Sequence, residues 1–407
     1  MPPTIVQGTL STEDAALSEE KKVDFDEKFK KLRPDETQFT TLTDRMGSTV
    51  AIREKVNWFE EDLFPRLVAA QSAALVGDLT MTLKAGQHKV VQPNDLLRNM
   101  RTGEGIRVTT VTPGSDVIGI VRGQGNTTNN PAAAINANDE FLVVGDAQPQ
   151  GAPFPNPRYL QRVLGFNYTE IFRTPWSFTG TAAAIEYYGG REPAKEIKRK
   201  TVEHKRKLEA SGFWGMRGYT ADAGAANGNE PLGTAGGLIE FIPASNKADA
   251  GQLPLTAGFF DKWLMNSLPY GSPDEKVLFA SPIVALNMSS WNRTGMGSQW
   301  APQDSKVHGV KVDAFISGAY GTRIPVIVKK EWSEFPYANK GYGGYAFLVD
   351  MSLVERRPLR DRDTRMLTNR QHPGDDKVSG EFLTEMTWQI AVPQAHGLLV
   401  GVDTIAS

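Results

Sequence analysis

The sequence contains no cysteine. This absence excludes disulfide bonds, thiolate nucleophiles and cysteine-ligated metal sites. There is also no run of about 18 apolar residues, so we expect no membrane-spanning segment. The first residues lack a basic start followed by an apolar core, so we expect no secretory signal. These absences predict a protein made in a cytoplasm, with a stability that does not depend on disulfides.

A strong excess of either charge is missing too. The 45 basic and 47 acidic side chains give a net charge of -2, whereas a free-standing nucleic-acid-binding protein usually has a basic excess. The hydrophobic content of 40% over 407 residues is enough for a sizeable core, and the length suggests two or three structural units. The 39 glycines and 25 prolines predict many turns and a β-rich or mixed architecture.

Sequence signatures of catalysis are absent. No phosphate-binding loop, dinucleotide fingerprint or nucleophile elbow occurs. The histidines are scattered, and no pair has the spacing of zinc ligands. We therefore predict no catalytic, cofactor-binding or metal-binding residue, no cofactor, and a protein that is not an enzyme. The five histidines are His88, His204, His308, His372 and His396.

A cluster of aspartates and arginines between residues 356 and 370 allows more than one interpretation. Asp361 and Asp363 flank Arg362, and several further arginines lie between residues 356 and 370. Paired carboxylates can do acid–base work, but among so many arginines a salt-bridge network is the better interpretation. A patch facing nucleic acid is the weaker alternative, because the aspartates dilute its positive charge.

The chain changes character along its length. Residues 12–32 are polar, with a thin apolar stripe at helical spacing, and predict an arm that folds against another surface; a disordered tail is the alternative. Residues 78–147 contain short β-type runs separated by glycines, which predicts a small inserted barrel or sandwich. The proline-rich residues 148–157 are predicted to be the linker that leads out of this inserted domain.

The clearest helix is predicted from Pro193 to Gly212. Pro193 suits a first helical position, apolar residues recur at helical spacing, and Gly212 is placed to end the helix in the left-handed conformation. His204 lies on the narrow apolar stripe, where a packed structural histidine is expected. The remaining faces are charged, including Glu209. The following residues, 213–237, are rich in glycine, alanine and asparagine and are interpreted as a long irregular loop.

Two amphipathic helices and several strands complete the pattern. One helix is predicted over 257–268 with Thr256 as its cap, and the other over 283–291 with Ser281 as cap and Pro282 in first position. Helices and strands interleave without regular βαβ repetition, which predicts an α+β fold. The predicted strands are 277–280, 307–316, 324–330, 345–349, 380–392 and 398–404.

The arrangement resembles the major head proteins of tailed bacteriophages, specifically the group with a β-rich insertion in an extended loop. The resemblance covers most of the chain and rests on the order of elements and on short sequence segments. These segments are Asp95-Leu96-Leu97, residues 105–108, residues 122–127, residues 139–142, Gly212-Phe213-Trp214-Gly215, residues 233–238, residues 381–392 and Ala395-His396-Gly397.

The resemblance implies an HK97-like capsid fold of the α+β class and a division of the chain. An N-terminal arm reaches over a neighbouring subunit, and a spine helix lies in a peripheral domain. The implied parts are the arm (1–47), the extended loop (48–77 and 148–180), the inserted β-rich domain (78–147), the peripheral domain (181–254), the axial domain (255–344) and the returning C-terminal strands (345–407).

The resemblance also implies a function and partners. It predicts a structural major capsid protein that self-assembles as hexamers and pentamers into an icosahedral head enclosing double-stranded DNA, located in the virion after assembly in the bacterial cytoplasm. Scaffold, portal and decoration proteins, and packaged DNA on the inner face, are the expected partners. An encapsulin-like nanocompartment shell remains an alternative, and a β-rich enzyme or carbohydrate-binding protein is a weaker one.

Overall fold

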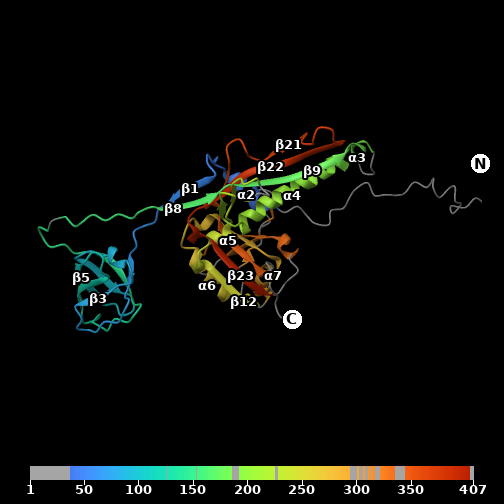
Figure 1. The fold of residues 1–407 in the computed structure, drawn as a ribbon. Coiled ribbons are helices and arrows are strands. Elements are labelled where there is room, and N and C mark those ends of the chain that lie inside the picture. Colours follow the sequence, from blue (N-terminus) through green and yellow to red (C-terminus); the bar gives the residue numbers. More distant parts are fainter. Residues whose placement is uncertain are drawn as a thin grey trace, which may run out of the picture. The chain divides into compact units, whose positions relative to one another are not determined.

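Two units make up the computed structural model of the chain (Figure 1). Unit 2 is Phe59–Leu164, and unit 1 contains the residues on either side of it. Unit 2 includes the range predicted for the inserted domain together with parts of the predicted extended loop. The structure describes residues 37–125, 127–152, 154–185, 192–224, 228–293, 300–301, 306–307, 310–311, 313–316, 321–334 and 344–403. Residues 12–32, which are expected to belong to an arm, lie outside these ranges.

Unit 2 is a β-barrel. Its six strands pair antiparallel in the order β2-β7-β4-β5-β6-β3. A bridge between Ala70 and Leu83 joins the two outer strands and closes the barrel. Alternate residues such as Ile106 and Val108 point into its core. The elements are β2 (Leu67–Ala69), β3 (Thr80–Thr82), η1 (Gln87–Lys89), β4 (Asp95–Asn99), β5 (Gly105–Val111), β6 (Val117–Val121) and β7 (Glu140–Asp146).

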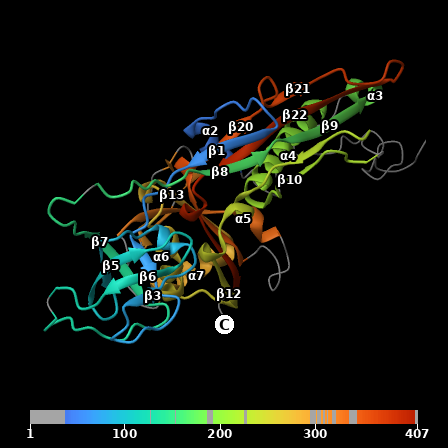
Figure 2. The ribbon, with the colours of Figure 1, turned by 60° about the vertical axis from the view of Figure 1, so that its left-hand side comes forward.

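Unit 1 contains a long antiparallel ribbon. Strand β9 (Glu170–Thr179) pairs with β22 (Lys377–Ile390) over ten residues, and β20 (Val354–Pro358) and β21 (Arg365–Leu367) pair with β22 as well. Helix α4 (Glu192–Trp214) lies along this ribbon (Figures 1 and 2). The alternating burial of β9 follows from its position, since one face meets α4 and the other does not.

Gly212 does not end the long helix, so that prediction was wrong. The helix continues to Trp214, and Gly212 lies inside it. A Cβ at this position would come within 2.5 Å of the Phe39 ring and 3.3 Å of Trp388. The glycine is explained by the close approach of two aromatic side chains.

A mixed seven-stranded sheet forms the rest of the unit 1 core, in the order β12-β23-β19-β13-β18-β17-β14. Helices α6 (Ala257–Ser267) and α7 (Pro282–Arg293) pack on it. The Thr256 hydroxyl accepts the Phe259 N–H, which confirms the predicted cap. The strands are β12 (Lys247–Pro254), β13 (Lys276–Ala280), β14 (Trp300–Ala301), β17 (Asp313–Ile316), β18 (Arg323–Val328), β19 (Ala346–Asp350) and β23 (Gly397–Asp403).

The segment predicted to be an irregular loop contains a small hairpin. Strands β10 (Gly218–Thr220) and β11 (Leu232–Thr234) pair antiparallel. Their side chains give little alternation in hydrophobicity, so the sequence pattern did not indicate them. The remaining elements are α2 (Gln38–Met46), β1 (Lys55–Glu60), β8 (Val163–Tyr168), α3 (Gly180–Ala184), α5 (Leu238–Phe241), η3 (Ala244–Asn246), η4 (Pro273–Glu275), β15 (Lys306–Val307), β16 (Val310–Lys311), η5 (Lys330–Glu334), η7 (Met351–Leu353) and η8 (Pro393–Ala395).

Candidate functional site

Helix α2, at the base of the N-terminal segment, is anchored in the core of unit 1. Phe39 is fully buried, and its ring lies 4.6 Å from that of Phe213, 5.6 Å from Phe279 and 5.2 Å from Trp388. The four rings meet at tilted or edge-on angles, which are favourable geometries for aromatic pairs. The first described part of the chain is therefore part of the subunit's own core.

A buried ion pair lies beneath the start of α2. Glu209 and Lys329 form it, and both side chains are almost completely inaccessible to solvent. The Glu209 carboxylate also accepts the backbone N–H groups of Phe39 and Thr40, each at 3.3 Å, while Lys329 donates to Gln38 at 2.9 Å. Burial raises the pKa of Glu209, and Lys329 opposes this effect. The Glu209 carboxylate thus accepts N–H groups that a helix cannot satisfy itself.

The arginine-rich stretch forms part of a salt-bridge network, as predicted. The Arg356 guanidinium contacts Asp44 of α2 at 2.5 Å and Asp363 at 2.8 Å. Arg362 pairs with Glu385 of β22. The network fixes α2 and the segment after β20 to the ribbon.

His204 is a structural histidine, as predicted. It is buried between α4 and the ribbon, where Nδ1 lies 3.0 Å from the Thr174 hydroxyl and Nε2 lies 2.8 Å from that of Thr384. Burial lowers the pKa of His204 to about 4, so the imidazole is neutral near pH 7. This side chain joins α4 to both long strands.

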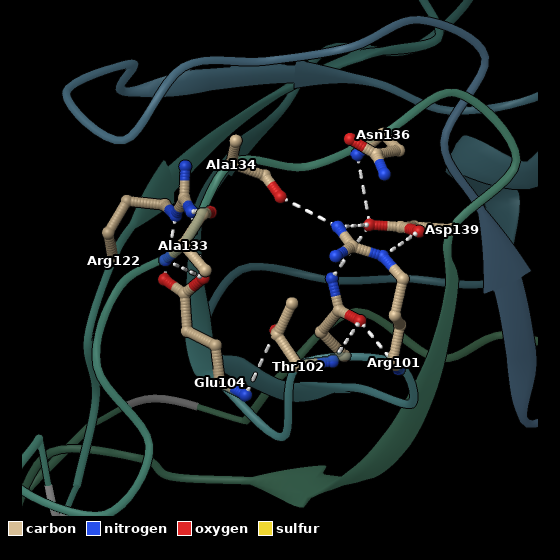
Figure 3. Close-up of polar contacts among 9 residues, drawn as sticks. Arg101, Thr102, Glu104, Arg122, Ala133, Ala134, Asn136 and Asp139 are labelled. Carbon is tan, nitrogen blue, oxygen red and sulfur yellow. Dashed lines mark hydrogen bonds and ion pairs between the residues drawn. The ribbon is translucent and has the colours of Figure 1, made fainter.

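Two polar clusters hold the loops of unit 2 in place. The Glu104 carboxylate is completely buried and pairs with Arg122 at 2.7 Å (Figure 3). Burial alone raises the pKa of Glu104, but hydrogen bonds from Arg122 and from the Ala133 and Gly123 N–H groups bring it below its ordinary value. The Arg122 guanidinium also donates to the Leu75 carbonyl at 2.9 Å. This cluster ties together three separate loops.

The second cluster lies around Asp139. The Arg101 guanidinium donates to both carboxylate oxygens, at 2.7 and 2.6 Å, and also to the Ala134 carbonyl at 2.7 Å (Figure 3). These hydrogen bonds lower the pKa of Asp139 to about 2. The Asn99 amide donates to the same carboxylate at 3.2 Å. A loop without regular strands is thus fixed by charged hydrogen bonds.

The two connecting segments of unit 2 expose large apolar side chains. Phe59 is 72% exposed and Leu63 87% exposed in the outgoing segment. Phe154 is 100% exposed and Tyr159 88% exposed in the proline-rich returning segment. Between them, Arg158 lies over the Phe64 ring at 4.7 Å and donates to the Val90 carbonyl at 2.5 Å. Apolar side chains grouped this way are typical of surfaces that a partner covers.

Within the part of the chain that the structure describes, no group of three or more histidine, aspartate or glutamate side chains could hold a metal ion. No described helix is both long and apolar enough to cross a membrane.

Comparison with known proteins gives two matches in sequence. The family model described as SU10 major capsid protein matches residues 5–403. A protein described as major capsid protein, from Pseudomonas phage PaMx41, is 27% identical over 392 residues, which cover 89% of this chain and 88% of the relative.

The solved structures that match the chain have low sequence identity to it. A chain from a structure of Gordonia phage Cozz is 10% identical, with a TM-score of 0.46 over 100% of this chain and 98% of the other. A chain from Microbacterium phage Oxtober96 is 11% identical, with a TM-score of 0.46 over 96% and 99%. The holo-SrpI encapsulin complex from Synechococcus elongatus PCC 7942 contains a chain that is 9% identical, with a TM-score of 0.42 over 61% of this chain and 80% of the other.

Proposed function

Because this chain belongs to the SU10 major capsid protein family, it is the major capsid protein of a phage, and we propose that copies of it self-assemble as hexamers and pentamers into a closed icosahedral head. The head encloses double-stranded DNA, with this genome against its inner face. The protein acts as a structural component of the virion, after assembly in the cytoplasm of a bacterial host.

The observation that carries this proposal is the exposure of the connecting segments. Phe154 and Tyr159 are almost completely exposed, and burying one such aromatic side chain contributes about 1.5–3 kcal/mol. A monomer gains nothing from this surface, whereas every copy in a closed shell gains it at each repeated interface. Large apolar interfaces are typical of obligate assemblies.

We propose, together with this function, the division of the chain that was predicted from the sequence. In it, the arm is 1–47, the extended loop is 48–77 with 148–180, and the inserted domain is 78–147. The peripheral domain is 181–254, the axial domain is 255–344, and 345–407 returns to the peripheral domain. Scaffold, portal and decoration proteins are the further partners that we propose for such a head.

Expression of the full chain tests the proposal. Size-exclusion chromatography with light scattering should give masses of pentamers, hexamers or closed particles, and negative-stain electron microscopy should show rings or shells. A second preparation, made with the neighbouring genes of the phage, supplies any scaffold. A monomer in both preparations, at every protein and salt concentration tried, would overturn the proposed assembly.

A further inference from the structure

Three side chains with complementary chemistry meet in the core beneath the start of α2: an amine, an amide and a carboxylate. The Lys329 Nζ donates to the Gln38 Oε1 at 2.9 Å and also contacts the Glu209 carboxylate. The Lys329 side chain is 0% exposed and that of Glu209 is 3% exposed. The three residues come from the end of β18, from α2 and from α4, so their side chains meet only in the folded chain.

The amine of Lys329 lies close to the side-chain amide carbon of Gln38. A carbonyl bond is about 1.23 Å long, so the Gln38 Cδ lies within about 4.1 Å of the Lys329 Nζ. Attack on a carbonyl begins from a separation of about 3–3.5 Å. A movement of about 1 Å or less therefore brings the amine to the position from which it forms a bond.

Glu209 is placed to move the protons that such a reaction requires. An amine attacks a carbonyl carbon only after it has lost a proton, and the Glu209 carboxylate contacts the Lys329 Nζ directly. Burial raises the pKa of Glu209, which makes its carboxylate a stronger base than an exposed one. A group that takes up a proton from the nucleophile can give it to the leaving group in the next step.

The surroundings hold the reacting groups and keep water away. Phe39, the neighbour of Gln38 on α2, is fully buried, and its ring lies 5.6 Å from the buried ring of Phe279. The backbone N–H of Lys329 donates to the Ala280 carbonyl at 2.8 Å, which fixes this residue at the end of β18. Exclusion of water removes the nucleophile that competes with the amine.

A second buried lysine shows what is particular to this arrangement. The Lys276 side chain is fully buried as well, and its Nζ donates to the backbone carbonyls of Ser267 and Ala395 at 2.8 and 2.7 Å. Attack on a backbone carbonyl would cut the chain. Attack on the side-chain amide of Gln38 joins two segments of the chain instead.

We propose that Lys329 and Gln38 of one chain form an isopeptide bond, with Glu209 as the catalytic acid–base residue. The Lys329 Nζ gives a proton to Glu209 and attacks the Gln38 Cδ. The new N–C bond forms, and the bond between Cδ and Nε2 of Gln38 breaks. The nitrogen of Lys329 loses two protons in all; both pass through Glu209 to the departing Nε2, which leaves as ammonium. The reaction needs no oxidant and no further reactant.

The bond joins two points that are 291 positions apart in the sequence. It fixes α2 to the end of β18, so the start of α2 cannot separate from the core of unit 1 when other contacts open. A disulfide commonly does this in other proteins, but the chain contains no cysteine. The link lies inside one subunit, so the inference does not depend on the proposed assembly.

Mass spectrometry of the purified full chain, held at neutral pH until its mass is constant, tests the proposal. We expect the wild-type chain to be lighter than its sequence by the mass of one ammonia molecule. Trypsin should release residues 32–45 and 324–330 as one joined peptide, because the enzyme does not cut after a modified lysine. Lys276 should appear unmodified in the same digest.

Denaturing electrophoresis gives an independent measurement. Tyr159 is 88% exposed, so brief chymotrypsin treatment of the folded chain should cut after it. Gln38 and Lys329 then lie on different fragments, and the absence of cysteine excludes a disulfide between them. Linked chains should therefore keep the two fragments joined after denaturation.

Variants separate the chemistry from the folding of the core. Gln38→Met removes the amide but leaves the ion pair of Glu209 and Lys329, so the chain should fold and keep its full mass. Glu209→Gln removes the acid–base group and should lower the rate of linking at least about 100-fold. Lys330→Met is the matched control, because Lys330 is the exposed neighbour of Lys329, and this variant should link like the wild type. A cooperative unfolding transition shows that each variant is folded.

The outcomes that would overturn the proposal are distinct. A wild-type chain that keeps its full mass and separates into two fragments would overturn it, whatever the variants do. Loss of ammonia that maps to another residue, such as an asparagine, would overturn the assignment to Gln38 and Lys329. A folded Glu209→Gln chain that links as fast as the wild type would overturn the catalytic role of Glu209.

Discussion

The start of α2 and the connecting segments of unit 2 both carry large aromatic side chains, but the two regions differ in whether these side chains are buried. Phe39 of α2 is fully buried among three aromatic rings, and its backbone N–H is bound by the Glu209 carboxylate. Phe154 and Tyr159 of the returning segment are almost completely exposed. The same kind of side chain thus stabilises the subunit at one place and is left uncovered at the other.

The difference separates folding from assembly. Contacts of α2 lie within the subunit, so their loss should lower the free energy of unfolding of unit 1. The connecting segments contribute little to the isolated subunit, so their loss should act on the formation of particles. Substitutions in the two regions therefore have distinct expected effects on stability and on assembly.

The largest effect on stability is expected from Phe39→Ala. Removing a buried phenylalanine ring loses its apolar burial and leaves a cavity, at a cost of about 3–5 kcal/mol. Denaturant unfolding of the subunit measures this loss. Leu42→Ala is the control, because Leu42 on the same helix is only partly buried. Equal losses for the two variants would contradict the anchoring role of Phe39.

Breaking the buried ion pair should cost slightly less. Lys329→Met leaves the Glu209 carboxylate buried without its partner, which costs about 3 kcal/mol. The double variant Glu209→Leu/Lys329→Met removes both charges and should be less destabilised than Lys329→Met, as chemical denaturation can establish. A double variant less stable than the single one would show that the pair itself, rather than the unpaired charge, dominates.

Acid should weaken unit 1 before unit 2. Burial lowers the pKa of His204 and of His396 to about 4, below the ordinary value of about 6.5 in an unfolded chain. Their contribution to stability is therefore complete above pH 6.5 and is lost as the pH falls towards 4, by about 2 kcal/mol per histidine between pH 6.5 and 5. In unit 2, Arg101 holds the pKa of Asp139 near 2, so this carboxylate retains its contribution at pH 5.

Calorimetry between pH 7 and pH 5 tests this difference. The transition of unit 1 should move to lower temperature while that of unit 2 stays in place. His204→Asn should remove about half of the shift. A unit 1 transition that does not respond to pH over this range would contradict the account.

Local signals in the sequence were sufficient for part of the fold. The Thr256 cap and the Pro282 position predicted α6 and α7, and runs of β-forming residues predicted β5, β6 and β22, because these features act within a few neighbouring residues. The structural role of His204 followed from its place on the apolar stripe of α4.

Features that depend on distant residues could not be predicted in this way. Glu209 was assigned to the charged faces of the long helix, yet it is buried because Lys329, 120 positions later, comes to meet it. Gly212 lacks a side chain because Phe39 packs against it, 173 positions earlier. No spacing pattern connects such pairs.

The smallest effect on stability, and the most direct test of the account, is expected from the connecting segment. The variant Phe154→Asp/Tyr159→Asp should unfold within about 0.5 kcal/mol of the wild type, since both side chains are exposed. Its control is Val117→Asp/Val144→Asp, at exposed positions on the barrel. Light scattering should show particles for the wild type and the control, and none for Phe154→Asp/Tyr159→Asp. Normal particles from that variant would contradict the central claim that neighbouring subunits cover these side chains.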